Sequence, residues 1–325
     1  MALINLDDSS EIRRDYRTGS YCIIVPGRSN RPEEVEENDV AARDLSKCPF
    51  EPGNESQSSE KMRIGDPWKI RVIANRFPEL SETTPVSSTG GLLPYTSGYG
   101  SNEIIIDSPS HFDKFEDMHS EQLWLWLNTV LEREQTLYSE RYIKYVQIFK
   151  NYGHLAGASL GHPHTQIMAW PVVVGKIDYE TRKLKNYKET DGKCLYEDVR
   201  TLEEPRKLFE NNTFYAVAPF GSRATAESMI IPKRHVNYAV DLSTNEKRDL
   251  IDAITMVLKT NNKLFGRQPY NFTFHDMKDD PDFHMHVEVY PRLSMYGGIE
   301  IGEDVFINTV SPEDYAEKFR KSAVA

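Results

Sequence analysis

Cysteine is scarce in this chain of 325 residues, which contains only Cys22, Cys48 and Cys194. An odd and sparse count argues against a framework of disulfide bonds and favours a reducing compartment, so we expect a cytoplasmic protein. Long apolar runs are absent as well, and the longest, around residues 21–26, is far too short to span a bilayer. No charged and then apolar leader follows Met1, so we expect neither a secretion signal nor a membrane partner.

Positive charge is also in short supply, because 39 Lys and Arg face 50 Asp and Glu and leave a net charge of −11. This balance argues against a general nucleic-acid binder, whose affinity comes from neutralising phosphates. A nucleotide substrate stays possible, since a phosphate site needs only a local cluster of cations. Arg28 and Arg31 can supply one; the alternative is a solvated turn before the acidic residues 33–37.

The most informative segment is His162-Pro163-His164-Thr165-Gln166. Residues at i and i+2 lie on the same face of an extended strand, so His162, His164 and Gln166 share one face. A neutral imidazole beside an amide can attack phosphorus, and the amide can then hold the phosphoryl oxygens. The segment therefore predicts nucleophilic chemistry on a phosphate.

A second, degraded copy of this segment stands at His284-Met285-His286-Val287-Glu288, and the features around each copy recur in the same order. The first set comprises Cys48-Pro-Phe-Glu51, an apolar strand 70–74, Pro109-Ser-His111, a helix from about 120 to 137 and a strand 145–149. The second set comprises Cys194-Leu-Tyr-Glu197, a strand 214–218, Pro232-Lys-Arg-His235, a helix from about 244 to 265 and a strand 270–274. Both helices show apolar periodicity near 3.6 residues, and Ser243 with Glu246 forms a capping box.

This repetition predicts an α+β protein made of two related halves, each an antiparallel sheet with a helix packed on one side. We expect the two sheets to pair edge to edge into one larger sheet with a pseudo-twofold axis. A polar connector runs from about residue 172 to 193 and ends near a turn signal at Asp191-Gly192. We place the boundary there, with a catalytic half at 1–190 and a second half at 191–325. Residues 80–101 are rich in Ser, Thr, Gly and Pro and predict a long loop, either ordered by a ligand or a tolerated insertion.

Each half also offers four residues of the kinds that bind zinc, which prefers tetrahedral N, S and O ligands. The two sets are Cys48, Glu51, His111 and His162, and Cys194, Glu197, His235 and His284. A carboxylate stands in both where a second cysteine is usual, and it can replace a thiolate as a harder ligand. The alternatives are three-ligand coordination without the glutamates, loss of metal from one site, or ordinary buried histidines. His275 is a spare candidate ligand near the second set.

Taken together, these motifs resemble the galactose-1-phosphate uridylyltransferase family, a branch of the histidine-triad superfamily, from about residue 13 to the C-terminus. The resemblance rests on the His162–Gln166 signature and on matches elsewhere. These are Arg28-Ser-Asn-Arg-Pro32, Ala74-Asn75-Arg-Phe77, Ser108-Pro-Ser-His111, Lys150-Asn151-Tyr-Gly153, Gly157-Ala-Ser159, Glu227-Ser-Met-Ile-Ile-Pro232, Gly297-Gly-Ile-Glu300 and Ser311-Pro-Glu-Asp314.

The resemblance implies a role for individual residues. His164 is the nucleophile, His162 binds zinc with Cys48 and His111, and Gln166 steadies the transferred phosphate. The positions matched to nucleotide, phosphate or substrate contacts are Arg28, Arg31, Asn75, Asn151, Ser159 and Glu300. The second metal site holds zinc or iron in relatives, and Glu180 falls where some members place an iron-binding glutamate. Relatives also suggest a homodimer.

The implied reaction is a double displacement between UDP-glucose and galactose 1-phosphate through a uridylyl-His164 intermediate. Two features depart from this pattern: both Cys-x-x-Cys pairs have become Cys-x-x-Glu, and residues 297–308 look closer to relatives that act on ADP-glucose. The alternatives are therefore an ADP-glucose phosphorylase or a dinucleoside polyphosphate phosphorylase of the same superfamily. A hydrolase that passes the nucleotidyl group to water, and a metal-stabilised nucleotide-binding protein without turnover, are the remaining alternatives.

Overall fold

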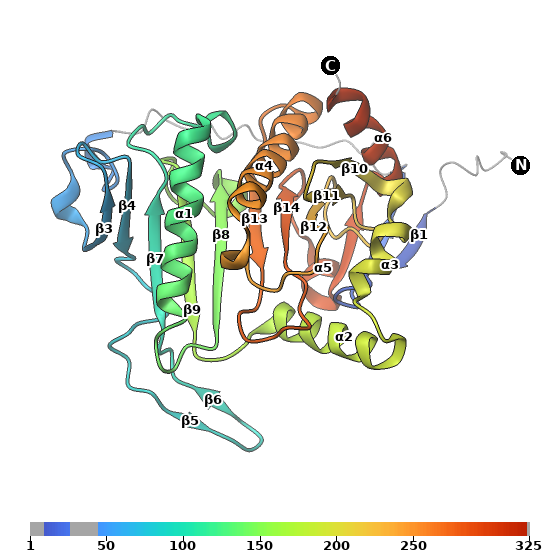
Figure 1. The fold of residues 1–325 in the computed structure, drawn as a ribbon, viewed down its shortest axis with the longest axis horizontal. Helices are drawn as coiled ribbons and strands as arrows, with labels where there is room; N and C mark the ends of the chain where they lie inside the picture. The colour runs from blue at the N-terminus through green and yellow to red at the C-terminus, as the bar shows by residue number, and fades with distance from the viewer. Residues whose placement is uncertain (1–9, 27–44, 324–325) are drawn as a thin grey trace, which may run out of the picture.

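The structure, a computed structural model, describes residues 10–26 and 45–323, and its centre is one ten-stranded antiparallel sheet (Figure 1). Across the sheet the strands follow the order β10-β11-β12-β14-β13-β8-β9-β7-β4-β3. In that order they are Lys207–Glu210, Phe214–Val217, Ser228–Pro232, His286–Pro291, Tyr270–His275, Tyr145–Tyr152, His164–Trp170, Ser101–Ile106, Ile70–Ala74 and Glu60–Ile64.

The two halves meet where β8 pairs with β13, with Tyr152 opposite Tyr270 and Phe149 opposite Thr273. On either side of this junction the chain follows the same order: three strands, a long helix, and two further strands. The rings of Tyr152 and Tyr270 stack with their centroids 5.0 Å apart across the junction. The prediction of two α+β halves joined edge to edge, with pseudo-twofold symmetry, is confirmed.

The long helices α1 (Ser120–Leu137) and α4 (Thr244–Phe265) lie on one face of the sheet, one over each half (Figure 1). Both have the bounds that the sequence predicts. Ser243 caps α4 in a capping box with Glu246, as expected. The N-cap of α1 is His119, whose side chain makes no capping hydrogen bond.

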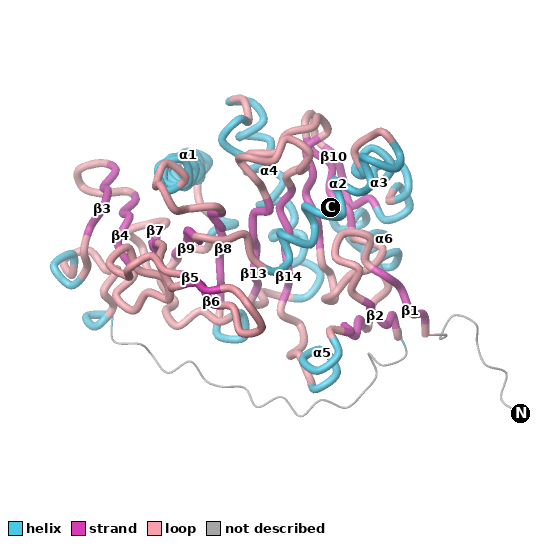
Figure 2. Tube along the Cα trace, turned by 90° about the horizontal axis from the view of Figure 1, so that it is seen from below, coloured by secondary structure: helices cyan, strands magenta, loops and turns pink. Residues whose placement is uncertain are grey.

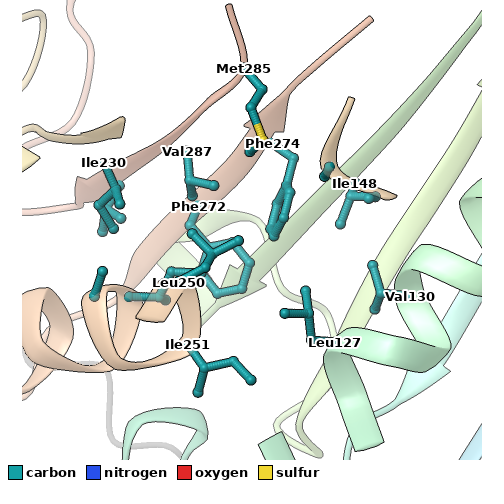
Figure 3. Close-up of a cluster of buried hydrophobic side chains, with 14 of the residues drawn as sticks. Leu127, Val130, Ile148, Ile230, Leu250, Ile251, Phe272, Phe274, Met285 and Val287 are labelled. Atoms are coloured by element: carbon teal, nitrogen blue, oxygen red, sulfur yellow. The ribbon is translucent and has the colours of Figure 1, made fainter. Parts of the chain in front are cut away.

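Between these helices and the sheet lies the main hydrophobic core (Figure 3). The apolar stripes of α1 and α4 meet apolar side chains of the central strands, among them Leu127, Leu250, Phe272 and Phe274. Buried Trp126 of α1 donates a hydrogen bond from Nε1 to Thr165 Oγ1 at 2.9 Å. Since side chains alternate along a strand, Thr165 on the helix side puts its neighbours His164 and Gln166 on the opposite face.

The predicted polar connector is an amphipathic helix, α2 (Gly175–Asp191), which is followed by α3 (Leu195–Leu202). Its apolar residues Ile177 and Leu184 pack in a second core cluster on the face of the sheet away from α4. Gly192 ends α2 with φ 74°, a left-handed conformation that glycine adopts without strain. The turn signal at this position is therefore confirmed, and the polar composition of the connector reflects the exposed side of a helix.

The N-terminal strands lie against the C-terminal half rather than the first one. β1 (Glu11–Arg14) pairs with β2 (Tyr21–Ile24), and β2 pairs in parallel with β15 (Val305–Asn308). The helices α5 (Gly298–Glu303) and α6 (Pro312–Ala323) flank β15 in the chain. The domain limits 1–190 and 191–325 stay a prediction, and this pairing carries residues 11–24 across the proposed boundary.

The remaining elements are short. Residues 80–101 form a projecting excursion with a small hairpin, β5 (Ser88–Thr89) and β6 (Tyr95–Thr96), visible in Figures 1 and 2. Its ordering by a ligand stays a prediction. Single-turn 3-10 helices occur at Leu45–Lys47, Glu55–Gln57, Phe115–Asp117, His154–Ala156, Glu204–Arg206 and Ala239–Asp241. Within residues 10–26 and 45–323, no helix has both the length and the apolar character needed to cross a bilayer.

Two buried carboxyl groups interact with each other: Glu134 of α1 and Asp276, the residue that follows β13. Burial raises the pKa of Glu134 well above its usual value, and the neighbouring Asp276 raises it further. Burial also raises the pKa of Asp276 to about 6. The folded protein therefore keeps a proton here that the unfolded chain releases at lower pH.

We expect Glu134→Gln to stabilise the protein at pH 8 by about 1–3 kcal/mol and to change its stability much less at pH 5. The folded-state pKa of Glu134 is raised, so wild-type stability falls as the pH rises above the unfolded value of about 4.5, whereas glutamine does not titrate. Urea unfolding of both proteins at the two pH values measures the difference. A variant no more stable than wild type at pH 8 would contradict this account.

Candidate active site and metal centres

His164 is the first residue of β9, and its ring is fixed by one hydrogen bond. Nδ1 lies 2.8 Å from the carbonyl oxygen of His162, and because a carbonyl can only accept, Nδ1 carries the proton. In the neutral ring Nε2 then holds the free lone pair. Burial lowers the pKa of His164, and the Lys150 ammonium lowers it further. The ring is thus neutral at physiological pH and has a nucleophilic Nε2.

This histidine lies at a pocket of about 460 Å³, a size that suits a nucleotide-sized ligand. The lining residues are Leu45, His111, Phe112, Lys114, Lys150–His154, Ala158 and Leu160–His164. Lys114 and His154 bring an ammonium and an imidazole group to its border, which favours an anionic ligand. One edge of the Phe50 ring approaches His164, with centroids 5.4 Å apart.

One border of the pocket is the segment between β8 and β9, which begins at Gly153 with φ 83°. A Cβ at Gly153 would lie 2.9 Å from the Cβ of Pro269, closer than side-chain atoms approach one another. Glycine is therefore required at this position for two reasons: the backbone is left-handed, and Pro269 leaves no room for a side chain. Asn151, just before it, accepts a hydrogen bond at Oδ1 from Asn271 Nδ2 at 2.7 Å, which holds this side of the pocket to β13.

The four residues of the first predicted metal set come together beside the pocket. One ligand atom from each of Cys48, Glu51, His111 and His162 lies within 4.8 Å of the others. Glu51 Oε1 is 2.6 Å from His111 Nδ1 and 3.2 Å from His162 Nδ1. We call this group the first cysteine cluster.

Its donor atoms suit a cation. His162 Nε2 donates to the carbonyl oxygen of Ser108 at 2.8 Å, so Nδ1 holds the lone pair that faces Glu51. Burial lowers the pKa of His162, which keeps this ring neutral. Lone pairs of an imidazole and a carboxylate that face each other at 3.2 Å repel unless a proton or a metal ion lies between them. Sulfur, nitrogen and oxygen in this number match the ligands that zinc prefers.

The second half brings together only three of its four predicted ligands, Cys194, His235 and His284, which we call the second cysteine cluster. His284 Nε2 faces the carbonyl oxygen of Pro232 and His235 Nε2 faces that of Pro281. Each ring therefore donates from Nε2, as His162 does, and keeps its lone pair on Nδ1. Burial lowers the pKa of His284 to about 3, so its ring offers a lone pair at physiological pH.

Glu197 is not part of this cluster. Its carboxylate accepts a hydrogen bond from the backbone nitrogen of Cys194 at 3.3 Å and closes a capping box at the start of α3. The Cys-x-x-Glu spacing here coincides with the N-cap and N3 positions of a helix, where a glutamate satisfies an otherwise free N–H. The two glutamates with the same sequence spacing thus differ in the structure, because only Glu51 turns toward its histidines.

The structure brings together a further group of ionisable residues in the second half. The sequence did not predict this group as a set. Ligand atoms of Glu180, His275, His286 and Glu288 lie within 4.8 Å of one another and are buried. His275 Nδ1 donates to Glu180 Oε2 at 2.8 Å. Glu180 and His275, which entered the sequence argument only as loose candidates, therefore do lie together.

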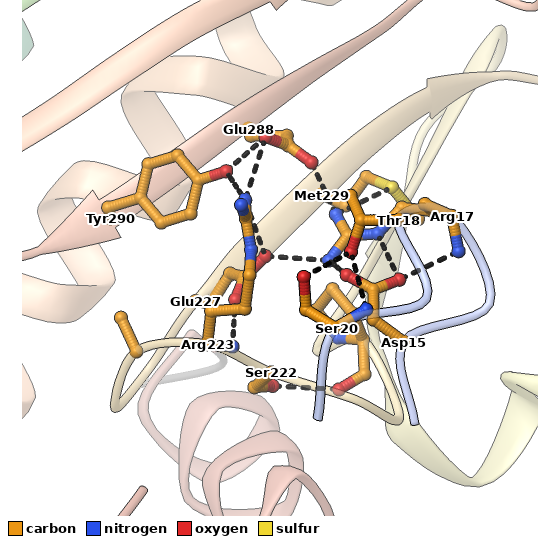
Figure 4. Close-up of polar contacts among 12 residues, drawn as sticks. Asp15, Arg17, Thr18, Ser20, Ser222, Arg223, Glu227, Met229, Glu288 and Tyr290 are labelled. Carbon is orange, nitrogen blue, oxygen red and sulfur yellow. Dashed lines mark hydrogen bonds and ion pairs between the residues drawn. The ribbon is translucent and has the colours of Figure 1, made fainter. Parts of the chain in front are cut away.

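The chain's own cations surround Glu288 in this group (Figure 4). Arg17 from the N-terminal segment pairs with Glu288, and it also contacts Asp15 and Glu227 at 2.8 Å each. Lys176 of α2 pairs with Glu288 as well, so its carboxylate is neutralised from two sides. Burial without such partners would cost several kcal/mol for each charge. This buried ion-pair network ties residues 15–17 and α2 to β14.

The same network makes the second copy unfavourable for binding a phosphate group. Glu288 occupies the position of Gln166, two residues after the second histidine of the copy, and its negative charge would repel a phosphoryl group. His286, at the position of His164, has no exposed surface and its Nδ1 faces the carbonyl oxygen of His284. Within the part of the chain that the structure describes, only the first copy combines a histidine that lines this pocket with an uncharged amide two residues later.

The other predicted site residues are distributed unevenly. Asn151 lines the pocket, whereas Asn75, Ser159 and Glu300 are not among its lining residues. Asn75 accepts a hydrogen bond from the backbone of Phe77. Glu300 accepts one from Gly297 N at the start of α5, so its local role is that of a helix cap. Arg28 and Arg31 lie outside the described residues.

Sequence reasoning missed two buried groups beside the nucleophile. Lys150 Nζ pairs with the Asp107 carboxylate and donates to the carbonyl oxygen of His164 at 2.8 Å. Lys150 appears in the sequence argument only as part of a longer motif, and Asp107 not at all. An available signal was a charged residue in each of two strands that are otherwise apolar, around residues 104–107 and 145–150.

Comparison with known proteins finds relatives that match this chain along most of its length. A family described as "Galactose-1-phosphate uridyl transferase, N-terminal domain" matches residues 2–173, and a domain of unknown function matches residues 116–324. ADP-glucose phosphorylase of Arabidopsis thaliana is 32% identical over 330 residues, which cover 97% of this chain and 93% of the relative. Galactose-1-phosphate uridylyltransferase of Thermotoga maritima is 27% identical over 329 residues, covering 97% and 99% of the two chains.

The chain belongs to the galactose-1-phosphate uridylyltransferase family. Among solved structures, an ADP-glucose phosphorylase from Arabidopsis thaliana with bound ADP-glucose is similar at a TM-score of 0.84 and 30% identity, covering 96% of this chain and 99% of that one. The family predicted from the sequence is therefore confirmed. The protein is an enzyme of the kind found in this family, which includes nucleotidyl transferases and phosphorylases.

We expect Glu51→Gln to weaken zinc binding at the first cysteine cluster by about tenfold or more, because it removes the charged ligand that faces both histidines. Glu197→Gln has the same spacing from its cysteine and is the matched control. It should leave metal affinity unchanged, since Glu197 caps a helix. Competition with a chromophoric chelator, together with the metal content of each purified variant, measures both. Equal losses in the two variants would contradict the assignment.

Proposed function

We propose that the protein transfers a nucleotidyl group from a nucleotide sugar to a phosphate-bearing acceptor through a nucleotidyl-His164 intermediate. The observation that carries this proposal is the neutral His164 ring at the pocket, with its proton held on Nδ1 by the His162 carbonyl. Membership of a family of transferases and phosphorylases supports it further. The intact signature with Gln166 favours turnover over simple binding.

In the first half-reaction, Nε2 of His164 attacks the α-phosphorus and forms a P–N bond. The bond from that phosphorus to the bridging oxygen breaks, and the sugar 1-phosphate leaves. The ring becomes positively charged as the bond forms, and its Nδ1–H donates more strongly to the His162 carbonyl. In the second half-reaction an oxygen of the acceptor phosphate attacks the same phosphorus, the P–N bond breaks, and Nε2 regains its lone pair.

The remaining site residues have supporting roles in this scheme. Gln166 lies on the same strand face as His164, so its amide can donate to the non-bridging oxygens of the transferred phosphate. Lys114 and His154 border the pocket and can attract the anionic acceptor. Asn75, Asn151, Ser159, Glu300, Arg28 and Arg31 stay proposed substrate contacts, of which Asn151 has direct support from the pocket lining.

We further propose that the first cysteine cluster holds zinc and that the second holds zinc or iron. At the first cluster, Cys48, Glu51 and His111 would be joined to His162, two residues before the nucleophile. A metal bound there would supply rigidity, because it would cross-link two separate segments, residues 48–51 and His111, to the start of β9. At the second cluster the proposed ligands are Cys194, His235 and His284. Glu197 is left out because its carboxylate caps the start of α3.

UDP-glucose and galactose 1-phosphate are the first candidate substrates, in line with the matching family and with the Thermotoga maritima relative. A specific observation favours a second candidate, ADP-glucose with inorganic phosphate. The plant ADP-glucose phosphorylase is 32% identical to this chain, against 27% for the bacterial uridylyltransferase. Both candidates use the same nucleophile and differ in base and acceptor. The homodimer and the cytoplasmic location stay predictions.

We expect the protein to acquire a covalent label when it is incubated with UDP-glucose or ADP-glucose labelled at the α-phosphorus, and His164→Ala to acquire none. A phosphoramidate is stable in alkali and labile in acid, so an alkaline quench followed by gel separation preserves the adduct. The ratio of label obtained from the two nucleotides decides the base preference.

The duplication supplies the matched control. His286→Asn changes the corresponding histidine of the second copy, away from the pocket, and should keep the label after the variant is shown to be folded by circular dichroism. Chasing the labelled protein with galactose 1-phosphate, phosphate or buffer alone then identifies the acceptor. Equal labelling of His164→Ala and wild type would overturn the proposal, and rapid loss of label into buffer would point to a hydrolase.

A further inference from the structure

A buried ion pair lies directly beneath the nucleophilic strand. Lys150 of β8 is 1% exposed, and Asp107, which follows β7, is 0% exposed. The Lys150 ammonium contacts the Asp107 carboxylate, donates to the His164 carbonyl oxygen at 2.8 Å, and lies 5.3 Å from the centre of the Phe115 ring. Phe115 belongs to the core under α1, so the ammonium lies on the helix side of the sheet, opposite the face that carries the His164 ring.

The pair bridges a place where the sheet opens. Pairing of β8 with β9 ends at Phe149 and Gln166, although β8 continues to Tyr152 and β9 begins at His164. A continuing antiparallel pair would use backbone N–H groups of β8 to satisfy the carbonyls of β9. The Lys150 ammonium bonds the His164 carbonyl instead. On the other side of the strand, Asp107 N donates to the Pro163 carbonyl oxygen at 3.0 Å.

The second half shows the same strands without this opening. There β13 pairs with β14 up to His275 opposite His286, which corresponds to His164. The residue equivalent to Lys150 is Phe274, a fully buried core side chain. The strand that corresponds to β7 ends in the apolar residues Ile231 and Pro232 where the first half has Asp107. The ion pair therefore accompanies the copy with the pocket and is absent from the copy without one.

A buried ion pair is a costly way to stabilise a core, because its desolvation offsets its attraction and apolar replacements are often as stable. The second half demonstrates such a replacement within the same fold. Stability alone therefore does not account for Lys150 and Asp107. What distinguishes their half is the separation of β8 from β9, which leaves room for the pocket in front of His164.

We propose that Lys150 and Asp107 form a positioning pair that holds the backbone of His164 in place where the strands separate, so that Nε2 stays aligned with the α-phosphorus. The expected effect on the reaction rests on the proposed function. The effect of the pair on the position of the His164 backbone does not depend on that function. Lys150 acts through the His164 backbone. Displacement of a nucleophile by about 1 Å can slow a reaction on the order of 100-fold, and that is the effect expected when the pair is removed.

The test is the double variant Lys150→Met/Asp107→Leu, which removes both charges and imitates the apolar second half. We expect covalent labelling in a single turnover to slow by about 10- to 100-fold, while the nucleotide concentration for half-maximal rate stays within about twofold. The rates are measured at pH 8, where the imidazole is neutral with or without the nearby ammonium. Hydrogen exchange of the peptide covering residues 161–168, followed by mass spectrometry, should become faster at unchanged global stability.

The matched control is Arg133→Met/Glu103→Gln, which removes another buried ion pair between α1 and β7 in the same half. It should leave the labelling rate and the exchange of residues 161–168 unchanged. If the apolar double variant does not fold, Lys150→Gln/Asp107→Asn takes its place with the same expectation, because glutamine is too short to bridge to His164. Lys150→Arg keeps a charged donor and should restore part of the rate.

The outcomes separate this inference from the proposed function. Slower labelling together with faster exchange supports the positioning pair. Unchanged labelling and exchange overturn it, and so does slower labelling with unchanged exchange, since that would indicate a direct effect on the substrate. If the wild-type protein acquires no label from any nucleotide sugar, the proposed function fails, and exchange alone then decides whether the pair holds the strand.

Discussion

Two hydrogen bonds from imidazole rings to backbone carbonyls determine what the histidines at the start of β9 can do. His162 donates from Nε2 to Ser108 and so directs Nδ1 at the first cysteine cluster. His164 donates from Nδ1 to His162 and so directs Nε2 away from the backbone. Opposite tautomers in two neighbouring rings thus direct one lone pair at the first cysteine cluster and the other away from it, which in the proposed scheme separates metal binding from nucleophilic attack. If either proton moved to the other nitrogen, the corresponding lone pair would be lost to a carbonyl.

Comparison of the two halves of the duplicated fold separates the structural features that both halves share from the features found around His164 alone. Both halves keep five strands and one long helix. Each half also has a cysteine close to a histidine, His162 or His284, whose Nε2 donates to a backbone carbonyl oxygen. The halves differ in charge. In the first half, His164 lines a pocket and the uncharged Gln166 follows two residues later, whereas the second half places Glu288 among Arg17, Lys176 and Arg223.

Much of this architecture was predictable from sequence because it depends on local periodicity and on repetition. The bounds of α1 and α4, the edge-to-edge sheets and the first cysteine cluster all follow from patterns that occur twice. Glu197 was expected among the metal ligands because it has the spacing of Glu51, but spacing alone does not distinguish a ligand from the N3 residue of a capping box. The polar connector concealed α2 because an amphipathic helix with one narrow apolar stripe has the composition of a linker.

Other features depend on contacts between distant segments, for which the sequence carries at most an ambiguous signal. Arg17 reaches Glu288 only because β1 and β2 lie against β15. Lys150 meets Asp107 because β7, β9 and β8 are neighbours in the sheet. In the sequence, Lys150 and Asp107 are each a single charge beside mostly apolar residues, a pattern that is equally compatible with an exposed strand edge. The position of His164, the proposed nucleophile, therefore rests partly on tertiary pairing that no motif encodes.

The central claim is that the nucleotide becomes bonded to Nε2 of His164. Phosphorus and nitrogen magnetic resonance of the trapped adduct, prepared with nitrogen-15-labelled histidine and kept alkaline, identifies the nitrogen that carries phosphorus. The account predicts one phosphorus coupled to Nε2, on the residue that peptide mass spectrometry assigns to position 164, with the proton retained on Nδ1. Phosphorus on Nδ1, or on any other residue, would contradict it.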